Sequence, residues 1–186
     1  MADLPEPKSP LHKLAVPDTF GVGNDKAIGV TLEDRLASSL VQVQAWPETL
    51  AKVEKAIAKE TGKDDRIMPS GPGRWLIEAD EEGLEDKLRG AIGTQWGAVT
   101  DLTHGRVVVT ISGEKATWVL ASGFALDFSL KTFPVGATRL SHHHELNATL
   151  FRTGESSFDL YVFTSYAGGF WHWITNAARE VGYEVV

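Results

Sequence analysis

The stretch ELNATLFRTGESSFDLYVFT, residues 145–164, decides the fold, because it reads as two long strands joined by a turn. Apolar and β-branched residues dominate both arms, about Glu145 to Arg152 and Ser157 to Thr164, and TGES between them supplies turn residues. The segment that follows, SYAGGFWHWITNAAREVG, has the spacing of a helix and leads into a last strand, YEVV. The local order is therefore strand, strand, helix.

The same order appears upstream of this hairpin. AIGVTLED and SSLVQVQAW read as strands, and PETLAKVEKAIAKETG reads as a helix with Pro47 at its first position and Gly62 just past its end. RIMPSGPGRWLIEAD predicts two short strands around a Pro/Gly turn, and EEGLEDKLRGAIG predicts a helix with Asp80 as its N-cap. GAVTDL and RVVVTIS are then strands before a helix, GEKATWVLASGF, with Ser112 as candidate N-cap. Paired strands separated by single helices predict an α+β fold with mainly antiparallel sheets.

The first 24 residues differ in kind from the rest of the chain. They hold four of the eight prolines, which fix φ and remove hydrogen-bond donors, so we expect residues 1–24 to form an extended arm. A frayed tail is one reading of this arm. Leu11 and Leu14 favour another, in which the arm lies on a second protein. The remaining 25–186 are expected to form one domain with halves of about 25–94 and 95–186.

Composition excludes several function classes. The chain has 186 residues, a net charge of -7 and a pI near 5.3, which disfavours a general nucleic-acid or membrane-surface binder. It has no cysteine, so it can form neither a disulfide nor a thiolate metal site. Its beginning lacks the apolar core of a signal peptide, and no apolar run is long enough to span a membrane. We therefore expect a cytoplasmic protein.

No catalytic motif stands out. The glycine-rich SGPGRW leads into a strand rather than a helix, so it predicts a structural turn and not a phosphate-binding loop. No Gly-x-Ser-x-Gly sequence is present to provide a nucleophilic serine. The sequence offers no candidate catalytic or cofactor-binding residue.

Three consecutive histidines, His142, His143 and His144, invite a metal-site interpretation. On a strand, however, His142 and His144 would share one face and His143 would point to the other. The other histidines, His12, His104 and His172, add no metal-binding spacing. We expect a surface cluster at the entry to a strand, and no metal site; a contact with a partner stays open.

The last helix carries a candidate partner contact. On a helical wheel, one apolar stripe comprises Tyr166, Phe170, Trp173, Ile174, Ala177 and Val181. Trp171 lies at the flank of that stripe, and we expect it to be exposed and to anchor a partner. The full set of candidate interface residues is Leu11, Leu14, His104, Arg106 and Trp171.

Several short motifs, weak one by one, are specific in their order and spacing. The motifs are SPLHKL near the start, GPGRWLIEAD, Asp101-Leu102-Thr103, Ile111-Ser112-Gly113, Leu126-Asp127, Phe133-Pro134-Val135-Gly136, Arg152-Thr153-Gly154, Phe158-Asp159-Leu160-Tyr161-Val162 and Ser165. Together they resemble the gamma subunit of heterotetrameric sarcosine oxidase. The resemblance runs from Ser9 to the end of the sequence and is thin between Leu32 and Ile67.

The resemblance implies a fold and a role. The fold would be that of the folate-binding aminomethyltransferase core, two ferredoxin-like halves in one unit. The role would be a non-catalytic subunit of a complex that demethylates sarcosine to glycine and passes the one-carbon unit to tetrahydrofolate. FAD, FMN, NAD and tetrahydrofolate would then be bound by partners, which are large flavin-bearing alpha and beta subunits alongside a small delta subunit.

Two alternatives stay open. One is the small subunit of a related N-methyl amino acid dehydrogenase, such as N-methylglutamate dehydrogenase. The other is a free-standing folate-handling or iron-sulfur assembly protein of the same fold. A folate protein would need a carboxylate for the pterin ring in its central cavity, and assembly factors of this fold typically carry a cysteine motif that this chain lacks.

Overall fold

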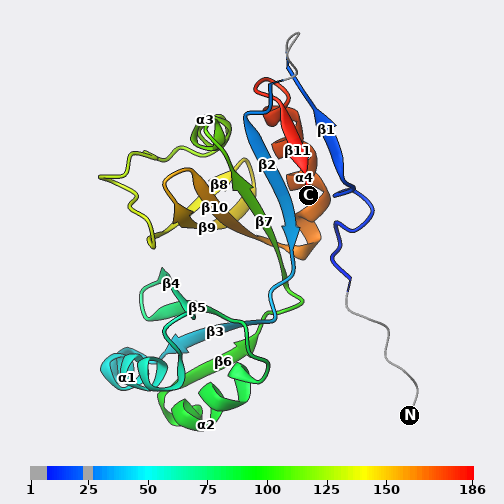
Figure 1. Ribbon diagram of the computed structural model, residues 1–186. Coiled ribbons are helices and arrows are strands. Elements are labelled where there is room, and N and C mark those ends of the chain that lie inside the picture. Colours follow the sequence, from blue (N-terminus) through cyan, green and yellow to red (C-terminus); the bar gives the residue numbers. More distant parts are fainter. Residues whose placement is uncertain (1–7, 23–26) are drawn as a thin grey trace, which may run out of the picture.

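The computed structural model describes residues 8–22 and 27–186, and it contains two β-sheets (Figure 1). Seven strands form the larger sheet, in the order β1-β11-β2-β7-β10-β9-β8, and four form the smaller, in the order β4-β5-β3-β6. Neighbouring strands are antiparallel except β11 and β2, which run parallel. The predicted α+β class with mainly antiparallel sheets is confirmed.

The smaller unit is continuous in sequence. It runs β3 Ser39–Ala45, α1 Leu50–Glu60, β4 Arg66–Gly71, β5 Arg74–Ala79, α2 Leu84–Trp96 and β6 Gly97–Asp101, with a 3₁₀ turn at Pro47–Thr49. This β-α-β-β-α-β order along the chain, together with the order β4-β5-β3-β6 in the sheet, is the ferredoxin-like arrangement. Val41, Val43 and Ile77 on one face of the sheet pack with Val53 of α1 and Leu88 of α2 into a buried core.

The larger unit, which consists of the seven-stranded sheet and the helices α3 and α4, repeats this plan with additions. Its elements are β1 Asp18–Phe20, β2 Val30–Arg35, β7 Arg106–Ser112, α3 Ala116–Ala121, β8 Thr138–His143, β9 Leu146–Gly154, β10 Ser157–Phe163, α4 Ala167–Ala178 and β11 Tyr183–Val185. From β7 to β11 the chain again forms a ferredoxin-like unit, but β2 is inserted between β7 and β11, and β1 and β8 extend the two edges. The predicted hairpin is β9–β10, paired through Leu150↔Leu160.

The two units face each other through the sheet surfaces that carry no helices. Leu40, Met68 and Leu76 of the smaller sheet form one buried cluster with Val108 and Tyr161 of the larger. The helices lie on the outer surfaces, with α1 and α2 beyond the smaller sheet in Figure 1. The inter-sheet region is therefore the place where side chains from both units can form a site.

These units do not follow the predicted division into 25–94 and 95–186. β2 precedes the smaller unit in the chain but belongs to the larger sheet, where it pairs with β7 through Leu32↔Ile111. β6, which begins at Gly97, belongs to the smaller sheet. The smaller unit is thus an insertion between two neighbouring strands of the larger sheet, and a repeat of element order alone could not reveal this.

The described part of the arm, from Lys8, folds onto its own domain. Leu11 is fully buried in the core of the larger unit, and Ser9 donates a hydrogen bond to Asp34 at 2.7 Å. Residues 18–20 then form the edge strand β1 against β11. Residues 1–7, 23 and 24 of the predicted arm lie outside the described residues. The described part of the arm is not extended throughout, because the N–H groups of Leu14 and Ala15 donate to the carbonyl of Leu11 and close a turn there. The arm also packs on its own chain at Leu11, where the prediction allowed a second protein.

Several local predictions need correction. The N-cap of α2 is Gly83 with φ 84° instead of Asp80, and that of α3 is Lys115 instead of Ser112, because both helices begin later than their sequence signals suggest. The Pro/Gly stretch after Ser70 does form a β-hairpin turn, between β4 and β5.

Within the described residues, no helix has the length and apolar character needed to cross a bilayer.

Candidate functional site

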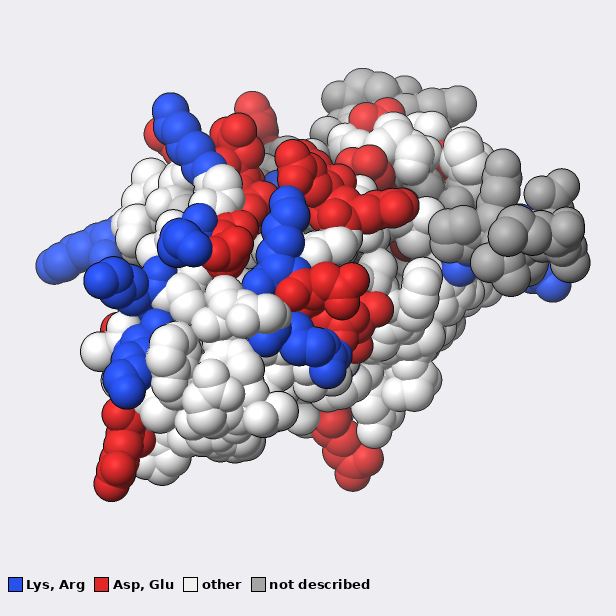
Figure 2. Space-filling view, turned by 90° about the horizontal axis from the view of Figure 1, so that it is seen from below, with Lys and Arg blue, Asp and Glu red and all other residues white. Residues whose placement is uncertain are grey.

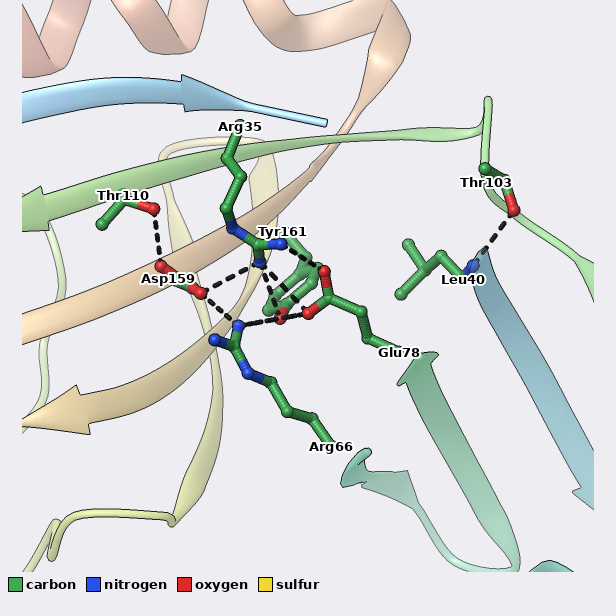
Figure 3. A network of polar contacts seen from close by, with 8 residues as sticks. All are labelled: Arg35, Leu40, Arg66, Glu78, Thr103, Thr110, Asp159 and Tyr161. Atoms are coloured by element: carbon green, nitrogen blue, oxygen red, sulfur yellow. Dashed lines mark hydrogen bonds and ion pairs between the residues drawn. The ribbon is translucent and has the colours of Figure 1, made fainter. Parts of the chain in front are cut away.

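Two arginines and two carboxylates meet between the sheets (Figure 3). Arg35 of β2 donates to Glu78 of β5 at 2.5 Å and to Asp159 of β10 at 3.0 Å. Arg66 of β4 donates to the same two carboxylates, at 3.1 Å to Glu78. Tyr161 completes the set by donating its hydroxyl to Glu78 at 2.5 Å. We call these five residues the inter-sheet network.

The carboxylates of this network are deeply buried. Glu78 is 5% and Asp159 2% exposed, whereas Arg35 and Arg66 keep 25% and 30% of their side chains in solvent. Thr110 of β7 donates to the second oxygen of Asp159 at 2.7 Å. Buried charges are tolerated when they are paired and hydrogen-bonded. Both acidic side chains are paired in this way, so the network is electrically balanced.

The electrostatics of the network follow from this balance. Burial raises the pKa of Tyr161 above its ordinary value, and the charge of Glu78 raises it further by disfavouring a second anion. Burial by itself would lower the pKa of Arg35, but its hydrogen bond to Glu78 and the nearby acidic charges raise it instead. Burial would likewise lower the pKa of Arg66, but its interactions with Tyr161, Asp159 and Glu78 raise it. Tyr161 therefore stays protonated, and Arg35 and Arg66 stay charged, over the physiological pH range.

The network bears on the folate alternative. A pterin-binding carboxylate must be free to accept hydrogen bonds from a ligand. Glu78 and Asp159 are the buried acidic side chains between the described strands, and both are already bonded to Arg35 and Arg66. The arrangement joins the two sheets and leaves neither carboxylate free for a ligand, which disfavours the folate-handling alternative.

Sequence reasoning did not single out any member of the network for chemistry. Its residues come from strands far apart in the chain, with 43 positions between Arg35 and Glu78 and 124 between Arg35 and Asp159. One signal was available: Glu78 and Asp159 each interrupt an otherwise apolar strand, WLIEA and FDLYV. A charge in such a strand indicates a buried pair, although it does not name the partner.

The five candidate interface residues differ in their exposure to solvent. Leu11 is fully buried and Trp171 is only 5% exposed, so neither is available as a surface anchor. Leu14 is 52% exposed, and the ring of His104 is exposed in the turn before β7. Arg106 is half-buried. Leu14, His104 and Arg106 therefore remain predictions of partner contact, and the expected exposure of Trp171 is wrong.

Trp171 is buried because the core-facing stripe of α4 is rotated from the predicted one. The buried positions are Ala167, Phe170, Trp171, Ile174 and Ala178. Trp173, expected in the core, is only partly buried, and Tyr166 is 48% exposed. Phe170 and Ile174 belong to both the predicted and the observed stripe. A helical wheel that contains them can therefore place the centre of the buried face on the Trp173 side or on the Trp171 side.

The three histidines separate at the end of β8. His143 packs against Trp173 with ring centroids 4.4 Å apart, and its Nδ1 lies 3.2 Å from the carbonyl of Gly123. His144 has φ 51° in the turn after the strand, so it does not share a strand face with His142 as expected. Among the residues that the structure describes, no three His, Asp or Glu side chains are arranged to hold a metal ion.

The short motifs of the sequence form turns and connections. Arg152 is 2% exposed and donates to the carbonyls of Phe128 and Phe133 at 2.8 and 2.6 Å, while Gly136 donates its N–H to the carbonyl of Arg152. The motifs around Phe133 and Arg152 therefore meet in space and fix the long loop before β8.

A second motif, Asp101-Leu102-Thr103, joins the end of β6 to the start of its neighbour β3. Thr103 donates to Asp101 from both its backbone N–H, at 2.8 Å, and its hydroxyl, at 2.6 Å. The same hydroxyl accepts the N–H of Leu40 at 3.0 Å (Figure 3). These hydrogen bonds lower the pKa of Asp101. In both motifs the polar groups are engaged in holding the backbone, which is a structural role.

The sequence of this chain matches a known protein family over more than half of its length. The sarcosine oxidase, gamma subunit family matches residues 49–180. Sarcosine oxidase subunit gamma of Corynebacterium sp. (strain U-96) is 32% identical over 182 residues, which cover 91% of this chain and 88% of the relative.

Solved structures show the same fold. A chain of the heterotetrameric sarcosine oxidase from Corynebacterium sp. U-96 matches with a TM-score of 0.80 and 24% identity, covering 94% of this chain and 96% of that one. Glycine cleavage system aminomethyltransferase T from Bartonella henselae matches with a TM-score of 0.56 and 15% identity, over 82% of this chain and 47% of its own length. The resemblance read from the motifs is confirmed, and the chain belongs to the sarcosine oxidase gamma subunit family.

Proposed function

We propose that this chain is the non-catalytic gamma subunit of a heterotetrameric sarcosine oxidase that demethylates sarcosine to glycine and transfers the one-carbon unit to tetrahydrofolate. The observation that carries the proposal is the match to a gamma subunit over 91% of the chain. The inter-sheet network supports the non-catalytic role, because its carboxylates are engaged by arginines of the same chain.

The proposal assigns the chemistry to partner chains. Large alpha and beta subunits would bind FAD, FMN, NAD and tetrahydrofolate, and a small delta subunit would complete the complex in the cytoplasm. The acidic composition supports a protein partner over nucleic acid. On the face seen in Figure 2, Lys and Arg side chains are interspersed with Asp and Glu, without a continuous basic patch among the residues drawn in colour.

Co-expression tests this proposal. The chain, tagged, is expressed with the genes that adjoin its own and purified by the tag. The expected result is a four-chain complex with flavin absorbance, whereas the chain purified alone has none. Purification of the chain without large flavin-bearing subunits, or a flavin spectrum from the chain alone, would contradict the proposal.

The substrate separates the two oxidoreductase assignments. The complex is assayed with sarcosine and with N-methylglutamate at equal concentrations, with and without tetrahydrofolate. Faster flavin reduction by sarcosine, together with tetrahydrofolate-dependent capture of the one-carbon unit, is expected. Preference for N-methylglutamate would instead assign the chain to the related dehydrogenase.

A further inference from the structure

A pocket of about 390 Å³ opens between the two sheets beside the inter-sheet network. This volume lies within the range of small-molecule sites, about 300–1,000 Å³. β3, β4 and β5 of the smaller sheet form one wall, and β7, β8, β9 and β10 of the larger sheet form the other. Its lining residues are Gln42, Ser70, Arg74, Arg106, Leu140, Ser141, His142, Asn147, Ala148, Thr149, Tyr161 and Phe163.

The charge of this lining is one-sided. Arg74 and Arg106 contribute two guanidinium groups and His142 an imidazole, and none of the lining residues is acidic. Among the described residues, neither arginine forms an ion pair. Tyr161, which the pocket shares with the inter-sheet network, belongs to a balanced set of two arginines and two carboxylates. Positive charge is therefore concentrated here in a chain whose net charge is -7.

Arg106 is held as a preformed but incompletely bonded donor. Its guanidinium carbon lies 3.4 Å from the centroid of the Phe163 ring, and this stacking fixes its plane. Arg106 is half-buried, and this burial lowers its pKa by disfavouring the charged form. The hydrogen bond that Nη1 makes to the carbonyl of Gly105, at 3.1 Å, uses one of five N–H donors. A carboxylate could accept two of the remaining four in a bidentate pair.

The remaining walls suit the rest of such a ligand. The Oγ of Ser70 is buried and has no hydrogen-bond partner among the described residues, and Thr149 is 9% exposed. Leu140 and Phe163, which also line the pocket, are 51% and 40% exposed. Polar groups together with exposed apolar side chains fit a carboxylate attached to an apolar body.

We propose that this pocket binds a carboxylate group, with Arg106 as its main partner and Arg74 as the second charge. The carboxylate belongs either to a small organic acid or to an acidic side chain of a partner subunit, since both present the same two oxygens. The carboxylate site itself rests on the pocket, and its assignment to a partner subunit's side chain rests on the proposed function.

Benzoate is a suitable probe because it combines a carboxylate with an apolar ring, and benzamide is its neutral counterpart. Titration of the full chain is followed by backbone and arginine side-chain NMR shifts. We expect saturable shifts at Thr149 and Arg106 with benzoate and about tenfold weaker binding in Arg106→Gln. Arg74→Gln, a change at an exposed residue, should weaken binding as well.

Arg179→Gln is the matched control. Arg179 is exposed and also lies over an aromatic ring, that of Phe20 at 5.4 Å, but it does not line the pocket. Its substitution removes the same charge and should leave benzoate affinity unchanged. Equal affinity for benzoate and benzamide, or unchanged benzoate affinity in both Arg106→Gln and Arg74→Gln, would overturn the proposal.

The co-expressed complex then distinguishes the two sources of the carboxylate. If a partner's acidic side chain occupies the pocket, the complex does not bind benzoate, and Arg106→Gln weakens assembly while Arg179→Gln does not. If a free acid occupies it, the complex binds benzoate as the isolated chain does, and Arg106→Gln assembles normally. Either result supports a carboxylate site.

Discussion

Replacing Glu78 by leucine should be among the most damaging single changes in the chain. Glu78 is 5% exposed and accepts hydrogen bonds from Arg35, Arg66 and Tyr161. Leucine is similar in size but can accept none of them. The substitution leaves two arginines facing a single carboxylate, Asp159, and leaves the Tyr161 hydroxyl without its acceptor.

The size of the effect follows from burial. Removing one partner of a buried ion pair costs about 3–5 kcal/mol. Arg35 and Arg66 keep a quarter to a third of their side chains in solvent, so water can compensate part of the loss. We therefore expect the low end, about 3 kcal/mol of unfolding free energy. In a domain of this size that corresponds to a fall in Tm of about 6–12 °C.

Urea unfolding monitored by tryptophan fluorescence measures the loss. Trp46, Trp75 and Trp96 report on the smaller unit, and Trp118, Trp171 and Trp173 on the larger. Glu85→Leu is the matched control, because Glu85 pairs with Arg89 on the surface of α2. Such a pair contributes less than about 1 kcal/mol.

A second substitution tests the cause. Adding Arg66→Met to Glu78→Leu removes one of the two arginines that then share Asp159 and leaves Arg35 paired with it. Part of the lost stability should return, because an apolar replacement of a buried pair is often neutral. If Glu78→Leu costs no more than Glu85→Leu, the network is not effectively buried and the reasoning fails.

Three further outcomes are expected. Trp171→Ala should lose about 3–5 kcal/mol of unfolding free energy, as for a buried aromatic, and a thermal melt that matches the parent would contradict its burial. Leu11→Ala should lose about 2–5 kcal/mol in urea, whereas Leu14→Ala, at an exposed position, should change little. Tyr161 has a pKa raised above 10.0 in the folded state, so the unfolded chain releases this proton first as the pH rises. Stability should then fall above about pH 10 by up to ~1.4 kcal/mol per pH unit, and Tyr161→Phe should remove that part of the slope between about pH 9 and pH 11.

Local signals predicted the elements well and their assembly poorly. The β9–β10 hairpin and helices α1, α2 and α4 follow from periodicity and turn residues within a few positions of one another. The pairing of β2 with both β7 and β11 depends on contacts across most of the chain, and no short pattern encodes it. β1 and β8 were missed because each is an edge strand with little apolar alternation.

Burial of single apolar residues was also beyond local reasoning. The sequence showed that Leu11 is apolar but not what it covers, and the arm proved to lie on the protein's own larger unit. Leu14 lies beside Gly168 of α4. If Gly168 carried a Cβ, that atom would be 3.7 Å from the Cδ1 of Leu14. A helical wheel drawn for α4 alone does not include the neighbours that cover it.

The placement of β11 sets the order in which the chain can fold while it is being made. β11 lies between β1 and β2, and the ribosome adds both of these strands to the chain before the smaller unit and long before β11. The smaller unit needs only residues 39–101 and can close during synthesis, since domains fold as units when their residues have emerged. The edges of β1 and β2 on that side stay unpaired until residues 183–185 have emerged. A nascent-chain pulse-proteolysis series should therefore show the internal unit protected first and the strands nearest the N-terminus protected last.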